Sequence, residues 1–358
     1  MVKDRINTLR DFLREKKLEG IIVNKLENVF YFSGFTGDDT MLVISQNDAV
    51  LVTDFRYVEQ SAAEAPDFRL VKQENGLLSK VADTIRIMGI ARLGFEGNAL
   101  VWDWFSHIKK NLSDEVHMES VQLDSLRQVK EQAEIDCIKK AMAISDQAFD
   151  DILGYIKPGI SENDVAARLE NVMRSLGSMR LAFATIVASG QRGSLPHGTA
   201  TEKLINYGEF VTMDYGAVYK GYHSDMTRTV CVGRADDKQR DVYDAVLKAQ
   251  LMGVSLVKPG VSGKEVDLEV RKYLDKRGYG KYFGHGLGHS LGLEIHESPS
   301  LSPKSQCTNL QTNMLVTVEP GVYIPDWGGV RIEDTVLITD KSKEVLTASP
   351  KELIEISV

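Results

Sequence analysis

Cysteine is scarce in this 358-residue sequence. The three cysteines, Cys137, Cys231 and Cys307, lie far apart and form no CxxC pair. An odd number of widely separated cysteines argues against a disulfide framework and favours a reducing compartment. We therefore expect a cytoplasmic protein.

The sequence also lacks long apolar runs and an excess of basic residues. No segment approaches the roughly 20 apolar residues that span a bilayer, and residues 1–17 are too charged for a secretory signal. Asp and Glu outnumber Lys and Arg by 51 to 43, which gives a formal net charge of −8. Nucleic-acid binding usually requires a basic patch. We expect a globular protein with no membrane or nucleic-acid partner.

The first part of the chain, residues 1–124, alternates helices and strands as α/β domains do. It opens with an amphipathic helix whose apolar face carries Ile6, Leu9, Phe12 and Leu13. We expect strands at 18–25, 48–60 and 92–97, and helices at 59–65, 75–90 and 101–112. No nucleotide-binding fingerprint occurs in this part. A polar segment at 123–135 then marks the link to a second domain, residues 125–358.

The second domain contains an internal repeat. The segment IKPGISENDVAARLE begins at Ile156, and VKPGVSGKEVDLEV begins at Val257. In each copy Pro-Gly ends one amphipathic helix. A capping-box pattern then begins the next helix: Ser161 with Asp164, and Ser262 with Glu265. Two such copies predict a duplicated α+β unit about a pseudo-two-fold axis, and the crevice at that axis is a natural site.

Two aspartates in the repeat region are predicted to face each other across a hairpin. The segment at 209–233 is rich in β-branched and aromatic residues and has Lys220-Gly221 at its middle. With that turn, Asp214 lies opposite Thr227, and Asp225 lies diagonally beside Asp214 on the same face, about 7–8 Å away at the backbone. Buried together without a cation, the two carboxylates would repel. The alternative is a pair of solvated strand aspartates.

Two glutamates end apolar strands near the C-terminus. Glu319 follows MLVTV, and Glu333 lies within VRIEDTVLI, where it shares one face with Arg331. Two carboxylates on apolar strands are difficult to explain as solvent-exposed surface residues. A salt bridge between Glu333 and Arg331 is the structural alternative.

Three of the seven histidines fall in one short segment, FGHGLGHSLGLEIHE at 283–297. Its four glycines argue against a helix, so we expect a loop that leads into a strand at 291–297. In that strand the apolar residues alternate with polar ones, and His296 points away from the apolar face. His285 and His289 are separated by an even step, so an extended chain directs both to the same side.

Together, two aspartates, two glutamates and one histidine form a mostly oxygen ligand set with one nitrogen. Such a set suits a pair of divalent metals such as Mn²⁺, Co²⁺ or Zn²⁺. Two metals about 3.5–4 Å apart share bridging carboxylates and a bridging water. The sequence therefore predicts a dinuclear metal site.

These motifs resemble the creatinase/aminopeptidase P/prolidase family, the pita-bread metallopeptidases, over essentially the whole chain. The likeness is carried by Asp214, Asp225, GHGLGH at 284–289, VEPGVY at 318–323 and GGVRIED at 328–334. It implies a creatinase-like α/β N-terminal domain and an α+β pita-bread catalytic domain with a pseudo-two-fold internal duplication. It also implies five metal ligands: Asp214, Asp225, His289, Glu319 and Glu333. Further active-site residues implied by the likeness are His197, His285, His296 and Arg331.

The resemblance implies a hydrolase that cleaves between an N-terminal residue and proline. Its motifs leave open whether the substrate is an Xaa-Pro dipeptide, as for prolidase, or a longer peptide, as for aminopeptidase P. A methionine-aminopeptidase-like enzyme is an alternative, and the N-terminal domain and Arg331 count against it. A non-catalytic peptide-binding member is another, and the intact ligand set counts against it. We expect two divalent ions, Mn²⁺ first with Co²⁺ or Zn²⁺ as alternatives, and a homodimer.

The resemblance assigns roles to individual residues. Glu319 would accept a proton from the attacking water and pass it to the proline nitrogen. His285 and His296 would bind the developing oxyanion or the proline side of the substrate, and His197 would close over the proline.

Two contacts are left open at this stage. Arg331 would hold Glu333 or a histidine, or would contact a substrate carboxylate. Asp38 and Asp39, in a loop broken by glycine, would meet the substrate amine or form a solvated turn.

Overall fold

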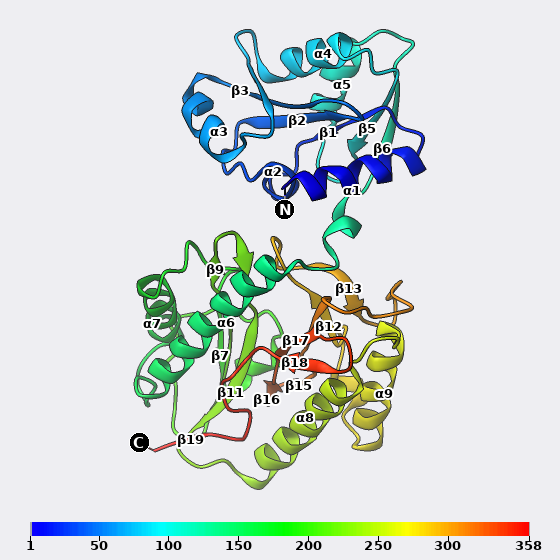
Figure 1. The fold of residues 1–358 in the computed structure, drawn as a ribbon. Coiled ribbons are helices and arrows are strands. Elements are labelled where there is room, and N and C mark those ends of the chain that lie inside the picture. The colour runs from blue at the N-terminus through cyan, green and yellow to red at the C-terminus, as the bar shows by residue number, and fades with distance from the viewer. Residues whose placement is uncertain (1, 358) are drawn as a thin grey trace. The chain divides into compact units, whose positions relative to one another are not determined.

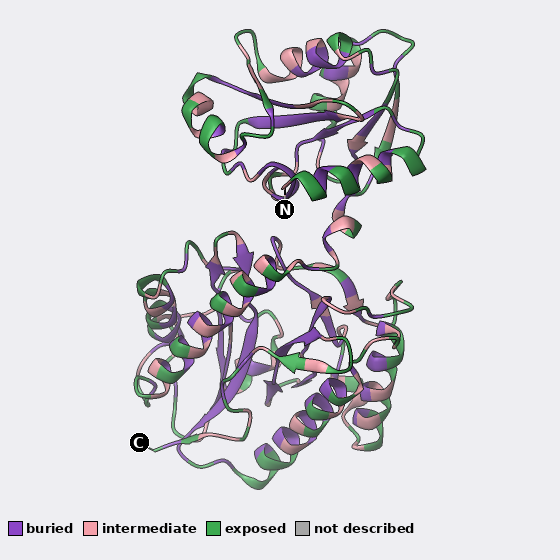
Figure 2. Cartoon of the chain, viewed as in Figure 1, coloured by how far each residue is buried: buried purple, intermediate pink, exposed green. Residues whose placement is uncertain are grey.

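The computed structural model describes residues 2–357. The chain divides into two compact units, Met1–Leu126 and Arg127–Val358 (Figure 1). Within the described residues, no helix combines the length and the apolar character needed to cross a membrane. In both units most strands and the inward faces of the helices are buried, whereas the outward helix faces and the strands β4, β6 and β18 are partly exposed (Figure 2).

The N-terminal unit is built on a six-stranded mixed sheet in the order β4-β3-β2-β1-β5-β6. The strands are β1 (Gly20–Val23), β2 (Thr40–Ser45), β3 (Ala49–Thr53), β4 (Arg69–Lys72), β5 (Arg92–Glu96) and β6 (His117–Val121). The helices are α1 (Val2–Glu15), α2 (Leu26–Ser33), α3 (Val58–Glu64), α4 (Leu77–Ile87) and α5 (Trp102–Lys110), with 3-10 turns at η1 (Phe55–Tyr57) and η2 (Asp124–Arg127). The predicted α/β class is confirmed.

One predicted strand in this unit is too long. The strand expected at 48–60 ends at Thr53, because the Asp54 side chain accepts a hydrogen bond from the Arg56 amide at 2.8 Å and begins a 3-10 turn. Strands β2, β4 and β6 and helix α2 were not predicted. Asp38 and Asp39 are both engaged within this unit: the Tyr57 hydroxyl donates to Asp38, and Arg56 pairs with Asp39.

The C-terminal unit consists of two similar halves. The first half contains α6 (Gln132–Leu153), α7 (Glu162–Ser175), β7 (Ile186–Ser189), η3 (Gly190–Ser194), β8 (Phe210–Tyr215), β9 (Val218–Tyr219), β10 (Tyr222–His223) and β11 (Met226–Val232). The second contains α8 (Asp237–Leu256), α9 (Gly263–Lys276), η4 (Gly280–Tyr282), β12 (Gly288–Ser290), β13 (Glu297–Leu301), β14 (Leu315–Val318), β15 (Gly321–Ile324), β16 (Gly328–Arg331), β17 (Asp334–Ile338) and β18 (Lys343–Val345). The last strand, β19 (Glu355–Ile356), returns to pair with β11.

Each half packs a helix pair against its own strands around a separate apolar core (Figure 1). In both halves the predicted capping box begins the second helix. The KPG turns also match. Gly159 and Gly260 have φ values of +90° and +87°, a conformation that favours glycine. Their amides donate to Ile205 and Leu310 carbonyls, each at 2.9 Å. The predicted internal duplication is confirmed.

Candidate metal centre

The predicted hairpin is present with the predicted register. Tyr219 pairs with Tyr222 around the Lys220-Gly221 turn, and Asp214 on β8 lies opposite Thr227 on β11. Both turn residues have positive φ, 48° and 87°, as a two-residue hairpin turn requires. Asp225 immediately precedes β11 and is buried.

The second half brings the two glutamates to the same place. Val318 on β14 pairs with Asp334 on β17, so Glu319 and Glu333 lie at the same end of this strand pair. The Glu319 amide donates to the Leu287 carbonyl at 2.9 Å, beside the strand that carries His289. The Glu333 amide donates to the Thr227 carbonyl at 3.1 Å. This hydrogen bond joins the second half to the aspartate hairpin of the first.

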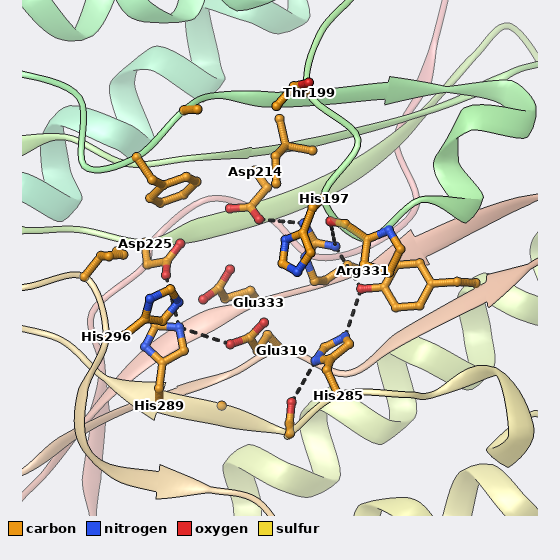
Figure 3. A pocket seen from close by; sticks show the side chains of 18 residues that line it. His197, Thr199, Asp214, Asp225, His285, His289, His296, Glu319, Arg331 and Glu333 are labelled. Carbon is orange, nitrogen blue, oxygen red and sulfur yellow. Dashed lines mark hydrogen bonds and ion pairs between the residues drawn. The ribbon is translucent and has the colours of Figure 1, made fainter.

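All nine predicted site residues line one pocket of about 460 Å³. The four carboxylates point into a common space, with His289 and His296 on one side and Arg331, His285 and His197 on the other (Figure 3). Apolar side chains line the same pocket: Phe183, Ala184, Ile186, Pro196 and Ile295.

The carboxylates fit divalent metal ions. One oxygen each from Asp214, Asp225 and Glu333 lie within 4.8 Å of one another. Asp214 Oδ1 and Glu333 Oε1 are buried and have no hydrogen-bond partner among residues 2–357, although buried carboxylate oxygens are normally satisfied. Oxygen atoms that converge in this way, with lone pairs unused, are the donors that hard divalent cations require.

Burial without a cation is unfavourable for these acids. Burial and then the nearby Glu333 carboxylate raise the pKa of Asp225 well above its usual value. Burial and then Glu319 raise the pKa of Glu333 in the same way. Burial is also the main cause that raises the pKa of Glu319 to about 7. Cations bound among the carboxylates would remove this penalty.

These shifts predict how pH affects the metal-free protein. The folded carboxyl groups bind protons more tightly than unfolded ones, whose pKa values are about 4, so folding takes up protons. These three groups therefore contribute stability that is fully present near pH 4.5 and is lost as pH rises to about 7, the pKa of Glu319. Burial lowers the pKa values of His285, His289 and His296, so these histidines oppose the trend up to about pH 6.5. Calorimetry of chelator-treated protein should therefore show a melting temperature that decreases with pH in the window that begins at about pH 6.5, where the histidines no longer contribute.

The same scan with saturating Mn²⁺ is the control, because metal replaces the protons and should reduce the decline. A metal-free melting temperature that increases with pH over this window would contradict this account of the charges.

The hydrogen bonding of His289 leaves one ring nitrogen available to bind a metal ion. Its Nδ1 lies 3.0 Å from the Ser290 carbonyl oxygen, which can only accept, so Nδ1 carries the proton. Its Nε2 lies 3.5 Å from Asp225 Oδ2 and 3.4 Å from Glu319 Oε1. Burial lowers the pKa of His289, which keeps the imidazole neutral and its Nε2 lone pair available, as metal ligation requires.

Arg331 contacts Asp214 and not Glu333. Its Nη2 lies 2.5 Å from Asp214 Oδ2, and its Nη1 donates to the Tyr323 hydroxyl at 2.8 Å and the Pro196 carbonyl at 3.2 Å. The alternative of a Glu333–Arg331 salt bridge is therefore wrong, although both side chains line the pocket. The arginine fixes one oxygen of Asp214 and leaves the other, Oδ1, directed at the cluster.

His285 has both ring nitrogens engaged. Nδ1 donates to the Gly286 carbonyl at 2.8 Å, and Nε2 lies 3.0 Å from the Tyr323 hydroxyl. Burial raises the pKa of Tyr323 to about 12 and lowers that of His285 to about 4, so the hydroxyl donates to a neutral ring. The predicted contact between His285 and substrate would have to replace one of these hydrogen bonds. Tyr323 was not predicted, although it lies within the VEPGVY motif.

The strand expected at 291–297 is wrong. Residues 291–296 form bends between β12 and β13, and the strand begins only at Glu297. The His223 amide donates to the Gly292 carbonyl at 2.8 Å, and the Glu294 amide donates to Glu297 Oε1 at 3.1 Å. These contacts fold the segment back on itself. His296 still reaches the pocket, with its ring 4.5 Å from that of His289.

Family models match both units. Residues 136–340 match metallopeptidase family M24, and residues 5–129 match the creatinase/prolidase N-terminal domain. The chain belongs to metallopeptidase family M24. The N-terminal match counts against the methionine-aminopeptidase alternative, and these comparisons do not support that alternative.

Similar proteins cover this M24 peptidase from end to end. An Xaa-Pro dipeptidase of Pyrococcus furiosus is 39% identical, over 99% of this chain and 100% of its own. The solved structure of an Xaa-Pro dipeptidase from Bacillus anthracis has 44% identity and a TM-score of 0.96, covering 99% and 100% of the two chains. A solved X-Pro aminopeptidase from Thermotoga maritima has 35% identity and a TM-score of 0.88, covering 95% and 98%.

Proposed function

We propose that this M24 peptidase hydrolyses the peptide bond between an N-terminal residue and proline, with Xaa-Pro dipeptides as its first substrate class. The observation that carries the proposal is the cluster of four buried or half-buried carboxylates and one neutral imidazole in a pocket that is otherwise partly apolar. Full-length similarity to Xaa-Pro dipeptidases supports it. The similar X-Pro aminopeptidase keeps longer peptides as the second candidate class.

The residues that would hold the metals are Asp214, Asp225, His289, Glu319 and Glu333. When bound, divalent ions supply an activated water and a polarised carbonyl group. The proposal includes two ions per chain, with Mn²⁺ ahead of Co²⁺ and Zn²⁺. A homodimer and a cytoplasmic location are also proposed, the latter on the cysteine usage alone.

Glu319 is the proposed proton carrier. Its Oε1 accepts a hydrogen bond from the Thr317 hydroxyl at 3.0 Å, which fixes the carboxylate and leaves Oε2 to receive a proton. A group in this position can take the proton from the attacking water and return it to the departing proline nitrogen.

The remaining pocket residues bind and orient the substrate in this proposal. Phe183, Ile186 and Ile295 offer apolar contact to a proline ring. Burial lowers the pKa of His296, so this imidazole is neutral and donates one hydrogen bond to the substrate. His197 lies on an exposed loop that lines the same pocket, where it can close over the proline.

A substrate panel tests the proposal. With Mn²⁺, Co²⁺ and Zn²⁺ added in turn, we expect turnover of Xaa-Pro dipeptides to exceed that of Xaa-Pro-Yaa-Zaa peptides and of Met-Ala peptides. The rates are measured by release of the N-terminal amino acid.

Other outcomes of the substrate panel would change or overturn the proposed specificity. Faster cleavage of Xaa-Pro-Yaa-Zaa would replace the dipeptidase assignment with an aminopeptidase P assignment. Faster cleavage of Met-Ala, or tight peptide binding without turnover under all three metals, would overturn the Xaa-Pro proposal.

A further inference from the structure

The segment that carries His197 is fastened at both ends to one buried side chain. This segment, residues 189–203, leaves β7, passes through η3 and brings Pro196, His197 and Thr199 to the pocket. His197 itself is exposed, so its position depends on the segment and not on close packing. Glu162, the first residue of α7, lies beneath the two ends of the segment and is fully buried.

The Glu162 carboxylate accepts hydrogen bonds from both ends of the segment. At the start, the Ser189 amide donates to Oε1 at 2.8 Å and the Ser189 hydroxyl donates at 2.9 Å. At the end, the Thr201 amide donates to Oε2 at 3.2 Å and the Thr201 hydroxyl donates at 2.7 Å. Arg192 pairs with the same Oε2 and also donates to the Thr199 carbonyl at 2.8 Å.

The middle of the segment is held by the strand that carries Arg331. A Cβ added to Gly193 would lie 3.0 Å from the Gly329 amide nitrogen on β16, so the two backbones are in close contact. Arg331 donates to the Pro196 carbonyl. The segment is thus placed between α7 and β16.

Two carboxylates that are not buried also contact the end of the segment. Glu202 accepts a hydrogen bond from Asn163 at 2.7 Å. Glu209 pairs with Lys203 at 2.6 Å. Glu162 differs from both because it is fully buried and binds both ends of the segment.

The internal repeat shows that this glutamate is not needed to begin a helix. Both second helices start with a serine N-cap and a capping box. The residue after the cap is Glu162 in the first half and Gly263 in the second, where a Cβ would lie 2.3 Å from the Ser300 carbonyl oxygen. A carboxylate therefore occurs at this position only in the half that carries the His197 segment.

We propose that Glu162 is a positioning residue that fixes the His197 segment against the pocket. It does not line the pocket, and it acts on the substrate only through the segment. A buried carboxylate must be fully hydrogen-bonded to be stable. Within the described residues, the backbone and side-chain donors to the Glu162 carboxylate all come from residues 189–201. The order of the segment and the burial of this charge therefore depend on each other. The catalytic consequence rests on the proposed Xaa-Pro activity.

The test is Glu162→Gln, which keeps the shape and removes the charge. We expect kcat/KM on an Xaa-Pro dipeptide to fall roughly 10- to 100-fold, the scale of a small displacement of a substrate-contacting group. Mn²⁺ affinity measured by calorimetry should be unchanged. In a His197→Ala background the same substitution should cause no further loss, because residues that act through one contact are not additive. Amide hydrogen exchange of residues 190–200 should become faster.

Glu202→Gln is the matched control, because Glu202 is exposed, lies next to Thr201, and as glutamine keeps an oxygen that can accept the hydrogen bond from Asn163. It should leave the kinetics and the exchange rates unchanged. If Glu162→Gln does not fold, Thr201→Val, which removes one donor to the same carboxylate, should give smaller changes of the same kind.

Two results would overturn the proposal. One is an equal loss of kcat/KM with and without His197, and the other is unchanged hydrogen exchange in the segment. Should the wild-type protein fail to cleave Xaa-Pro peptides, the proposed function fails, while the exchange experiment still decides whether Glu162 holds the segment.

Discussion

An Asp225→Asn variant should fold and lose peptide hydrolysis, with kcat/KM lower by on the order of 10³-fold or more, the scale of losing a charge-stabilising group from an active site. Asp225 is buried beside Asp214 and Glu333, and burial followed by these neighbouring carboxylates raises its pKa well above the usual value. The amide has nearly the same shape but lacks the charge that a divalent cation requires of its ligand. Metal content by elemental analysis, together with steady-state kinetics, measures the effect.

The stability of the same variant gives an independent check. Without metal, Asp225→Asn removes repulsion from the cluster, so the chelator-treated variant should melt at or above the temperature of the chelator-treated wild type. Added Mn²⁺ should stabilise the variant less than the wild type. Asp237→Asn, on an exposed position of α8, is the matched control and should change neither quantity. Full activity of the Asp225 variant would refute the metal centre.

A Glu319→Gln variant should lose roughly 10²- to 10⁴-fold in kcat, the usual contribution of a positioned acid or base. Its amide keeps the hydrogen bond from Thr317 but cannot accept the proton of the attacking water. The pH dependence of kcat should change as well, because the proton carrier is gone. Stopped assays across pH on an Xaa-Pro dipeptide with added Mn²⁺ measure both effects.

Metal content separates the two roles assigned to Glu319. Loss of turnover with bound metal retained would identify proton transfer as its main contribution. Loss of metal to the extent seen in Asp225→Asn would identify it as a ligand. A kcat equal to that of the wild type would exclude the proton-carrier role.

Local rules were sufficient to predict much of the site. The hairpin register around Lys220-Gly221 follows from turn chemistry and a period of two, so the positions of Asp214 and Asp225 could be derived. The KPG turns and capping boxes are equally local. By contrast, the choice of His289 as the ligand came from the family resemblance, and the structure supplies a physical reason for it in the Ser290 carbonyl.

Features that depend on long-range contacts could not be predicted. Arg331 pairs with Asp214, which is 117 residues away in the sequence. The sequence pattern of the strand that carries Arg331 contains no information about this partner. The bends at 291–296 depend on the His223 contact with Gly292, 69 residues away. Glu162 looked like an ordinary residue in the first turn of a helix. The short strands β4 and β6 are partly exposed and carry little apolar pattern.

The proposed ligands are divided between the two halves of the duplicated unit. Asp214 and Asp225 belong to the first half, and His289, Glu319 and Glu333 to the second. Metal binding and the association of the two halves are therefore thermodynamically linked. A change that weakens the contact between Thr227 and Glu333 should weaken metal binding, and bound metal should stabilise that contact by the same free energy. A metal ion held by these ligands would also link the two halves of the duplicated unit to each other.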